Sequence, residues 1–280
     1  MSKRLFSRMK VSLLMVVTLS MLLVPMAEAA NPYPNSMVAF GDSISRAFNT
    51  GSTAFSDATQ NAWSTGTTAS VNSQYLRILA ANPAISGKNY NNAVTGARMS
   101  NLLGQVNASP AGMGYVTILM GANDACASSE AAMTTVANYQ SQFASALTAI
   151  AAKDPNAQIF VASIPNIKQL WSLLKGNFWA RTIWGLLGTC QSMLANPTST
   201  SATDTARRTR VDQRVKDFNS ALATECAKYA NCRFDSNTVY NYQFTASQVS
   251  TRDYFHPSLA GQTKLAEITF ASAKAAFGWT

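Results

Sequence analysis

Histidine is nearly absent from this sequence, since His256 is the only one in 280 residues. No Cys-x-x-Cys pair accompanies it, so the sequence lacks the ligand spacing of a zinc site. Lysine and arginine form no dense cluster, and we therefore expect no nucleic-acid partner. The Gly-x-Ser-x-Gly signature of a nucleophile elbow is also missing, because Ser45 stands where the second glycine would be. Any chemistry that needs a histidine base must use His256.

The first 30 residues have the pattern of a secretory signal peptide. Basic side chains precede an apolar run over residues 11–24, and Ala27-Glu28-Ala29 provides a small-x-small cleavage motif. This run is shorter than the roughly 20 residues that a membrane-spanning helix requires. We therefore expect cleavage after Ala29 or Ala30 rather than an uncleaved anchor, and secretion of one domain over residues 31–280.

Charge and cysteine content fit an exported protein. The formal net charge is +9, and cleavage lowers it to +6 because residues 1–29 carry four basic side chains and one acidic. All four cysteines follow the expected cleavage site, and an even number is typical of disulfide-bonded exported proteins. Three pairings are open to four cysteines. We favour a tight local loop, Cys226–Cys232, together with a bridge between two long loops, Cys126–Cys190.

Short apolar strands alternate with amphipathic helices after residue 31. Strands are predicted at residues 37–41, 90–94, 115–120, 157–164 and 232–235. Helices are predicted at residues 71–81, 131–153, 206–229 and 259–277. This alternation predicts an α/β protein with a parallel sheet of about five strands, covered on both faces as a three-layer α/β/α sandwich. The Ser/Thr-rich residues 197–205 predict an exposed loop.

Ser43 and His256 can act together in nucleophilic chemistry. A serine hydroxyl becomes a nucleophile when a histidine takes its proton and a carboxylate holds the imidazole in the right tautomer. Asp253 lies three residues before His256 and would supply that carboxylate within one turn. Asp235, at the end of the last predicted strand, is the alternative, and we favour Asp253. Pro257 disfavours helical geometry at His256, so we expect the last helix to begin after it.

Two further turns offer hydrogen-bond donors for a negatively charged oxygen, as an acyl-transfer enzyme requires. Gly96 follows the second predicted strand and has a backbone N–H that can approach closely. Asn123 follows the third and offers its side-chain amide. Each turn taken alone equally fits a structural turn, because glycine and asparagine favour turns. Both nevertheless share the carboxyl edge of the predicted sheet with Ser43.

These segments together resemble the GDSL, or SGNH, hydrolase family. The family has Gly-Asp-Ser near the mature N-terminus, a lone glycine, Gly-x-Asn-Asp and then Asp-x-x-His, and all four occur here in that order. The resemblance implies that Ser43 is the nucleophile, His256 the base and Asp253 the orienting acid. It also implies an oxyanion hole formed by the N–H groups of Ser43 and Gly96 and the side chain of Asn123.

The same resemblance implies a flavodoxin-like fold and no metal or other cofactor. One departure from the family pattern is Ile44, which replaces the leucine that usually follows Gly-Asp-Ser. Residues 62–66 and 166–171 look like the phospholipase B-like branch, which includes exported bacterial lipases.

Residues 166–195 are rich in tryptophan and leucine. They contain three of the five tryptophans, together with basic but no acidic side chains. Tryptophan beside basic residues is typical of a lipid–water interface. We interpret residues 166–205 as a lid or acyl-binding insertion with Trp171, Trp179 and Trp184 as substrate contacts. A buried helical hairpin that completes the core is an equally good interpretation.

The sequence therefore predicts a secreted carboxylic ester hydrolase, a lipase, esterase or phospholipase, that forms an acyl-enzyme. We expect a monomer that acts on lipid esters and contacts a lipid interface. A carbohydrate O-acetylesterase would use the same machinery, but a polar sugar platform would then replace the Trp/Leu-rich segment. A surface binding module that keeps the fold without the reaction is the alternative from another class, and the complete set of catalytic residues disfavours it.

Overall fold

A five-stranded parallel sheet forms the centre of the protein in a computed structural model that describes residues 32–280. The expected signal peptide lies outside the described residues. The strands are β1 (Met37–Gly41), β2 (Asn89–Asn91), β3 (Tyr115–Leu119), β4 (Gln158–Val161) and β5 (Cys232–Phe234). They lie in the order β2-β1-β3-β4-β5 with every pairing parallel. The predicted parallel sheet is confirmed.

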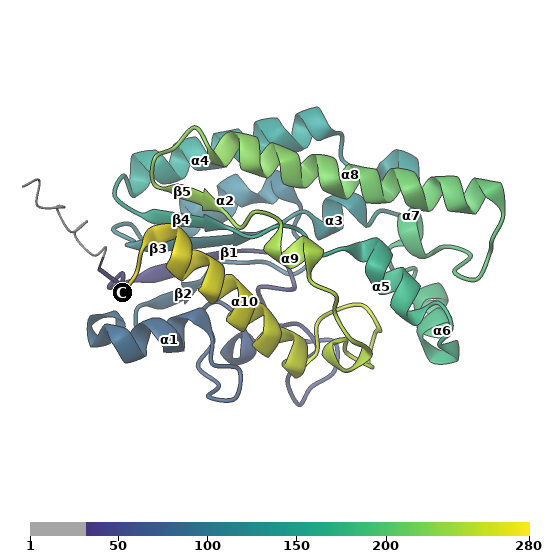
Figure 1. Cartoon of the computed structure of the whole chain (residues 1–280), viewed down its shortest axis with the longest axis horizontal. Helices are drawn as coiled ribbons and strands as arrows, with labels where there is room; N and C mark the ends of the chain where they lie inside the picture. The colour runs from purple at the N-terminus through teal and green to yellow at the C-terminus, as the bar shows by residue number, and fades with distance from the viewer. Residues whose placement is uncertain (1–31) are drawn as a thin grey trace, which may run out of the picture. The chain divides into compact units, whose positions relative to one another are not determined.

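Helices cover both faces of this sheet. They are α1 (Gln74–Ala81), α2 (Leu102–Ala108), α3 (Ala122–Ala125), α4 (Val136–Lys153), α5 (Ile167–Leu174), α6 (Phe178–Leu186), α7 (Gln191–Leu194), α8 (Ala202–Cys226), α9 (Thr238–Asn241) and α10 (Leu259–Phe277). Helices α2, α4 and α8 lie on one face, and α1 and α10 lie on the other (Figure 1). The arrangement is the expected three-layer sandwich.

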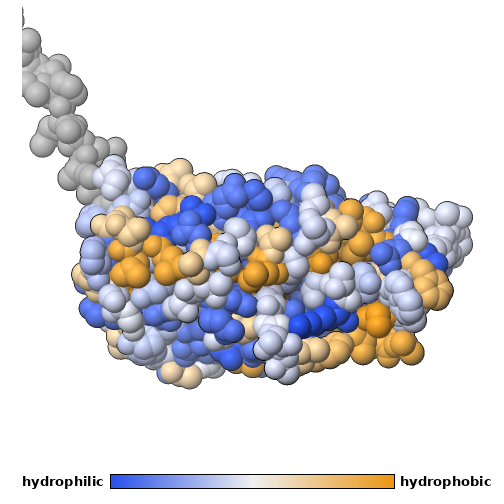
Figure 2. Space-filling view, turned by 90° about the horizontal axis from the view of Figure 1, so that it is seen from below, coloured by the Kyte–Doolittle hydropathy of each residue, from blue (hydrophilic) through white to orange (hydrophobic). Residues whose placement is uncertain are grey.

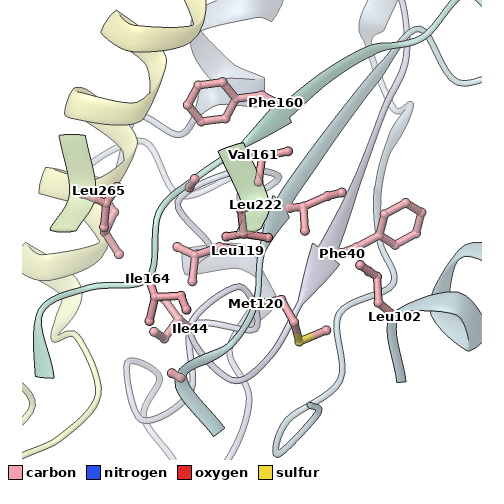
Figure 3. Close-up of a cluster of buried hydrophobic side chains, with 14 of the residues drawn as sticks. Phe40, Ile44, Leu102, Leu119, Met120, Phe160, Val161, Ile164, Leu222 and Leu265 are labelled. Carbon is pink, nitrogen blue, oxygen red and sulfur yellow. The ribbon is translucent and has the colours of Figure 1, made fainter. Parts of the chain in front are cut away.

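The core lies between the sheet and these two helical layers. Every residue of β1 and β3 is buried, which explains why both strands read as continuous apolar runs rather than as alternating ones. Figure 3 shows Phe40, Leu119 and Phe160 of the sheet in one cluster with Leu222 of α8 and Leu265 of α10. Since those two helices lie on opposite faces, the strands are held from both sides and their carboxyl ends are fixed in place.

The strand order places three turns at one edge of the sheet. β1 lies between β2 and β3, and the turns that contain Ser43, Gly96 and Asn123 directly follow these three strands. In a parallel sheet the carboxyl ends of the strands meet at the same edge, and ligands bind where the strand order reverses. The expected meeting of these three turns is therefore a consequence of the topology.

Three helix starts differ from the sequence prediction because side-chain caps fix them. Helix α1 begins at Gln74 rather than at residue 71, since the Ser73 hydroxyl accepts a hydrogen bond from the N–H of Leu76. Helix α8 begins at Ala202, inside the predicted loop, since the Ser201 hydroxyl accepts a hydrogen bond from the N–H of Asp204. Helix α4 begins only at Val136, since Thr135 accepts from the N–H of Asn138 in the same way. Helix α2 was not predicted, because Gly104 and Asn107 interrupt its apolar pattern.

The four cysteines form the two disulfides that we favoured. One joins Cys126 to Cys190 across 64 residues, and the other joins Cys226 to Cys232. Among the helices of residues 32–280, none has the length and apolar character needed to cross a membrane.

Candidate active site

Ser43 lies on a turn whose backbone is fixed on both sides. Before it, Gln105 exchanges two hydrogen bonds with Gly41, accepting from its N–H at 2.9 Å and donating to its carbonyl at 2.8 Å. After it, the Asp42 carboxylate accepts from the N–H of Ile44 at 2.9 Å. This side-chain-to-backbone turn closes over Ser43 and determines the direction of its hydroxyl.

Ser43, His256 and Asp253 form a hydrogen-bonded chain. His256 Nε2 lies 2.7 Å from Ser43 Oγ, and His256 Nδ1 lies 2.7 Å from Asp253 Oδ2. In the tautomer with its proton on Nδ1, the imidazole donates to the carboxylate and accepts from the serine hydroxyl. The other oxygen of Asp253 accepts from the N–H groups of Phe255 and His256. The arrangement is that of a nucleophile, its base and an orienting acid.

The Asp253 carboxylate is kept ionised by its neighbours. Burial opposes its charge, but the hydrogen bond and positive charge of His256 and the N–H groups of Phe255 and His256 outweigh burial and lower the pKa of Asp253. An ionised carboxylate is what stabilises an imidazolium during proton transfer. The alternative carboxylate, Asp235, instead accepts from the Ser163 hydroxyl and the N–H groups of Asn237 and Val239.

Hydrogen-bond donors converge beside Ser43. Ser43, Gly96, Asn123 and His256 line one hollow, and within the described residues the N–H groups of Ser43 and Gly96 donate no hydrogen bond to the protein. Asn123 Nδ2 donates one proton to the carbonyl of Ala97 at 2.9 Å, which orients the amide and leaves its second proton available. Three N–H groups are therefore available for a negatively charged oxygen.

Asp124 joins the Asn123 turn to the Gly96 turn. Its carboxylate accepts from the N–H of Met99 at 2.9 Å and from the Thr134 hydroxyl at 2.7 Å. Burial raises its pKa, while these two donors lower it in part. The turn itself requires Gly121, whose φ is +128° and where a Cβ would come within 2.6 Å of the Tyr139 hydroxyl oxygen.

Two hollows meet at Ser43. One, which we call the apolar hollow, is lined by residues of the Ser43 turn, the Asn123 turn, α5 and the loop before α10. Its apolar wall consists of Ile44, Ile167, Leu170, Phe244 and Val249. The other, which we call the Gly96-side hollow, is lined by Phe48, Thr95 and Thr189 among others.

Sequence comparison assigns the family. The profile of the GDSL-like Lipase/Acylhydrolase family matches residues 37–269, which include the Ser43, Gly96, Asn123 and His256 segments. The chain belongs to this family. It is therefore an ester hydrolase of the serine type. No curated protein sequence matches the chain.

Solved structures share the fold of this GDSL hydrolase. An extracellular lipase from Streptomyces rimosus is 20% identical with a TM-score of 0.52, over 85% of this chain and 99% of that one. A putative GDSL-like lipase from Parabacteroides merdae is 17% identical with a TM-score of 0.52, over 87% and 98%. The acetylxylan esterase Axe2 from Geobacillus stearothermophilus is 16% identical with a TM-score of 0.50, over 87% and 96%.

Asn49 is a residue of the GDSL hydrolase site that sequence reasoning missed. Its side-chain amide donates to Asp253 Oδ2, the oxygen that also faces His256, and its own oxygen accepts from the N–H of Phe55 at 2.6 Å. Arg252 fastens the same loop by donating to the carbonyl of Thr53 at 2.9 Å. Asn49 and Asp253 are 204 residues apart, so no local pattern could have shown their contact.

The three tryptophans predicted to contact substrate do not line either hollow. Trp171 donates from Nε1 to the carbonyl of Pro197 at 2.8 Å. Trp184 is buried and donates to the carbonyl of Tyr254 at 3.0 Å, two residues from His256. Trp179 is exposed on α6. The structure instead places the first turn of α5, with Ile167 and Leu170, at the apolar hollow.

Proposed function

We propose that this GDSL hydrolase is a secreted serine carboxylic ester hydrolase that acts on esters of apolar acyl chains. The observation that carries the proposal is the chain of two 2.7 Å contacts from Ser43 Oγ through His256 to Asp253. Such a chain at the edge of a hollow with free N–H donors fits acyl transfer. The same hydrogen-bonded chain disfavours a binding module, because binding alone does not require an activated serine.

The proposed reaction proceeds in two steps. Ser43 Oγ attacks the ester carbonyl carbon while His256 Nε2 takes its proton, and the carbonyl oxygen becomes an oxyanion held by the N–H groups of Ser43, Gly96 and Asn123. The bond to the alcohol then breaks, and His256 returns the proton to the leaving oxygen. Water attacks the acyl-enzyme in the same manner, which releases the acid and restores Ser43.

The apolar hollow, which we call the acyl hollow, supports an apolar acyl group. Its wall of Ile44, Ile167, Leu170, Phe244 and Val249 would take a hydrocarbon chain out of water. Each buried methylene contributes about 0.8 kcal/mol, so reactivity should rise with chain length until the hollow is full. We assign the alcohol part of the substrate to the Gly96-side hollow, where Thr95 and Thr189 supply hydroxyl groups.

A carbohydrate O-acetylesterase is the second candidate. The fold it shares with Axe2, which is named as an acetylxylan esterase, and the threonines of the Gly96-side hollow favour it. An acetyl group, however, is too short to contact the whole apolar wall formed by Ile167, Leu170, Phe244 and Val249. The longer acyl chain therefore fits the site better.

Secretion is part of the proposal. The protein has two disulfides, Cys126–Cys190 and Cys226–Cys232, and disulfides persist mainly in oxidising compartments. The basic and apolar pattern of residues 1–30 provides the export signal. We further propose that the enzyme works as a monomer, since the catalytic residues, the donors and both hollows belong to one chain.

The decisive experiment measures release of p-nitrophenol from acetyl, octanoyl and palmitoyl esters by the protein from residue 31. We expect kcat/KM to rise at least 100-fold from acetyl to octanoyl, and Ser43→Ala to lower kcat by about 10⁶. Activity on the acetyl ester alone would favour the O-acetylesterase. Full activity without the Ser43 hydroxyl would refute the mechanism.

Ser45→Ala is the matched control for this experiment. Ser45 lies two residues along the same buried turn, and its hydroxyl has no hydrogen-bond partner within the described residues. Its removal should leave turnover within a few-fold of wild type. A loss similar to that of Ser43→Ala would mean that the turn tolerates no substitution.

A further inference from the structure

Helices α5 and α6 form a hairpin with two different sides. Its inner side is buried and carries Ile167, Leu174, Ala180 and Trp184. Its outer side exposes five large apolar side chains, which we call the hairpin patch: Leu173, Phe178, Trp179, Leu186 and Leu187. Phe178 and Trp179 are each 62% exposed, and Leu186 is 77% exposed. Single exposed apolar residues are ordinary on a protein surface, but a cluster of this size marks a contact surface.

The cluster is concentrated in one place. Of the ten large apolar side chains exposed within residues 32–280, the hairpin patch supplies five from residues 173–187. In Figure 2 hydrophobic surface is present at the right-hand end, the end at which Figure 1 places α5 and α6, as well as in the middle and at the left of this face. Neither hollow includes a patch residue, so the enzyme's own site does not account for the patch.

The charged side chains of the hairpin itself all have one sign. No aspartate or glutamate occurs between residues 155 and 203, while Lys175 and Arg181 flank the exposed rings. Lys175 Nζ lies 4.3 Å from the Trp171 ring centroid, and Arg181 donates to the carbonyls of Lys175 and Gly176. Within the described residues, neither forms a salt bridge with a carboxylate.

We propose that the hairpin patch docks the enzyme on a lipid surface that carries anionic phosphate headgroups. Tryptophan and phenylalanine side chains insert at the acyl boundary, while lysine and arginine remain at the headgroups. A second copy of the chain fits this surface poorly, because an interface between two patches would bring the basic residues of both copies together. The lipid surface would present the substrate to the proposed ester hydrolase, and only the identity of that substrate rests on the proposed function.

The hairpin is tied to the active site at three points, so docking brings the site to the lipid without a hinge motion. The first turn of α5 lines the acyl hollow with Ile167 and Leu170. Trp184 of α6 donates to Tyr254, beside His256. The Cys126–Cys190 disulfide joins the segment after α6 to the loop that follows Asn123. The expected lid is therefore better described as a fixed platform at the mouth of the acyl hollow.

Vesicle binding tests this platform separately from catalysis. The Ser43→Ala protein from residue 31 is sedimented with vesicles of phosphatidylcholine, alone or with phosphatidylglycerol. We expect F178A/W179A/L186A in this background to bind at least ten-fold more weakly. The control Y90A/L103A, which removes two exposed apolar side chains elsewhere, should bind within two-fold of the parent. Unchanged binding by the triple variant would overturn the proposal.

Charge and oligomeric state provide the second arm. K175Q/R181Q should weaken binding about five-fold per charge on vesicles with phosphatidylglycerol and little on phosphatidylcholine alone, and high salt should remove the difference. A lipid-free dimer that the triple substitution dissociates would overturn the proposal, because the patch would then face a second copy.

A soluble ester provides the third arm. With Ser43 present, F178A/W179A/L186A should hydrolyse p-nitrophenyl butyrate at the wild-type rate. Equal losses on the soluble ester and on vesicle lipid would overturn the platform role, since the hairpin would then only support the site. If the wild-type protein binds vesicles but hydrolyses no ester, the proposed function is refuted and the docking inference remains intact.

Discussion

The loops around Ser43 and the outer side of the α5–α6 hairpin differ in which side chains they bury and which they expose. Around Ser43, polar side chains such as Asp42, Asp124 and Asp253 are buried, and hydrogen bonds hold nearly all their oxygen atoms. On the hairpin patch, large apolar side chains face outward and are exposed to solvent. In the first region, contacts between distant segments fix the positions of the polar side chains. In the second region, the local composition of the hairpin leaves apolar side chains available to a partner. Catalysis needs the former, because a small displacement of a reacting group slows the reaction greatly.

After the loss of the Ser43 hydroxyl, the largest effect should come from the Asp253 carboxylate of the polar region. Asp253→Asn keeps the shape of the side chain but favours the wrong imidazole tautomer, so we expect kcat on a soluble ester to fall by about 10⁴. Asp235→Asn is the matched control, since Asp235 is also buried but holds backbone N–H groups at the end of β5. It should lower the melting temperature with little change in kcat. Comparable losses of kcat in both variants would contradict the role of Asp253.

Asp42 should make the polar region sensitive to pH, unlike the hairpin patch. Burial raises its pKa from 3.8 to about 7, against the N–H of Ile44 and the charge of His256, and its Oδ2 has no partner within residues 32–280. The unfolded chain therefore loses this proton at lower pH than the folded one. Stability should decline as the pH rises from about 4 to about 7, by on the order of 4 kcal/mol at most.

Asp42→Asn checks this prediction, because asparagine is neutral at every pH. Urea unfolding at pH 4.5, 5.5, 6.5 and 7.5 should show a flatter pH dependence for the variant than for the wild type. Parallel curves would mean that Asp42 is ionised in the fold throughout this range.

Asn49 should have a smaller effect, through Asp253. Asn49→Ala removes a donor to the carboxylate, which raises the pKa of Asp253. We expect kcat to fall about ten-fold, the cost of a hydrogen bond to a charged group, and the acid limb of the kcat/KM profile to move to higher pH. Thr50→Val, in the same loop, should alter stability but not the profile. A variant with lower kcat and an unmoved acid limb would show that Asn49 only supports the loop.

The smallest effect should separate the two sides of the hairpin. Trp184→Phe removes the donor to Tyr254 and should lower soluble-ester kcat/KM a few-fold, since a neutral hydrogen bond contributes about 1 kcal/mol. Trp179→Phe, on the exposed side, should leave it unchanged. Equal effects of the two substitutions would remove the distinction between the anchored side and the patch.

Much of the fold was predictable, because strands β1 and β3 are buried on both faces and therefore read as unbroken apolar runs. The helix boundaries were less accurate where one side chain decides them, as Ser201 does for α8. Ser43, His256 and the two donor turns were predictable as candidates because each follows a strand or lies on a distinctive short motif. Composition alone could not separate the three tryptophans by role. It predicted substrate contact for all of them, although Trp171 and Trp184 donate hydrogen bonds to the rest of the protein and Trp179 is exposed.

The sequence by itself determined the alternation of strands and helices and the residue types available for acyl transfer, since each depends on short segments, and it limited the four cysteines to three possible pairings. Only the tertiary structure decided that Asn49 holds Asp253, that Ile167 and Leu170 rather than the tryptophans line the apolar hollow, and that five apolar side chains of the hairpin remain outside. These outcomes depend on contacts between segments up to 204 residues apart. The packing of the sheet fixes such contacts, and no local pattern encodes them.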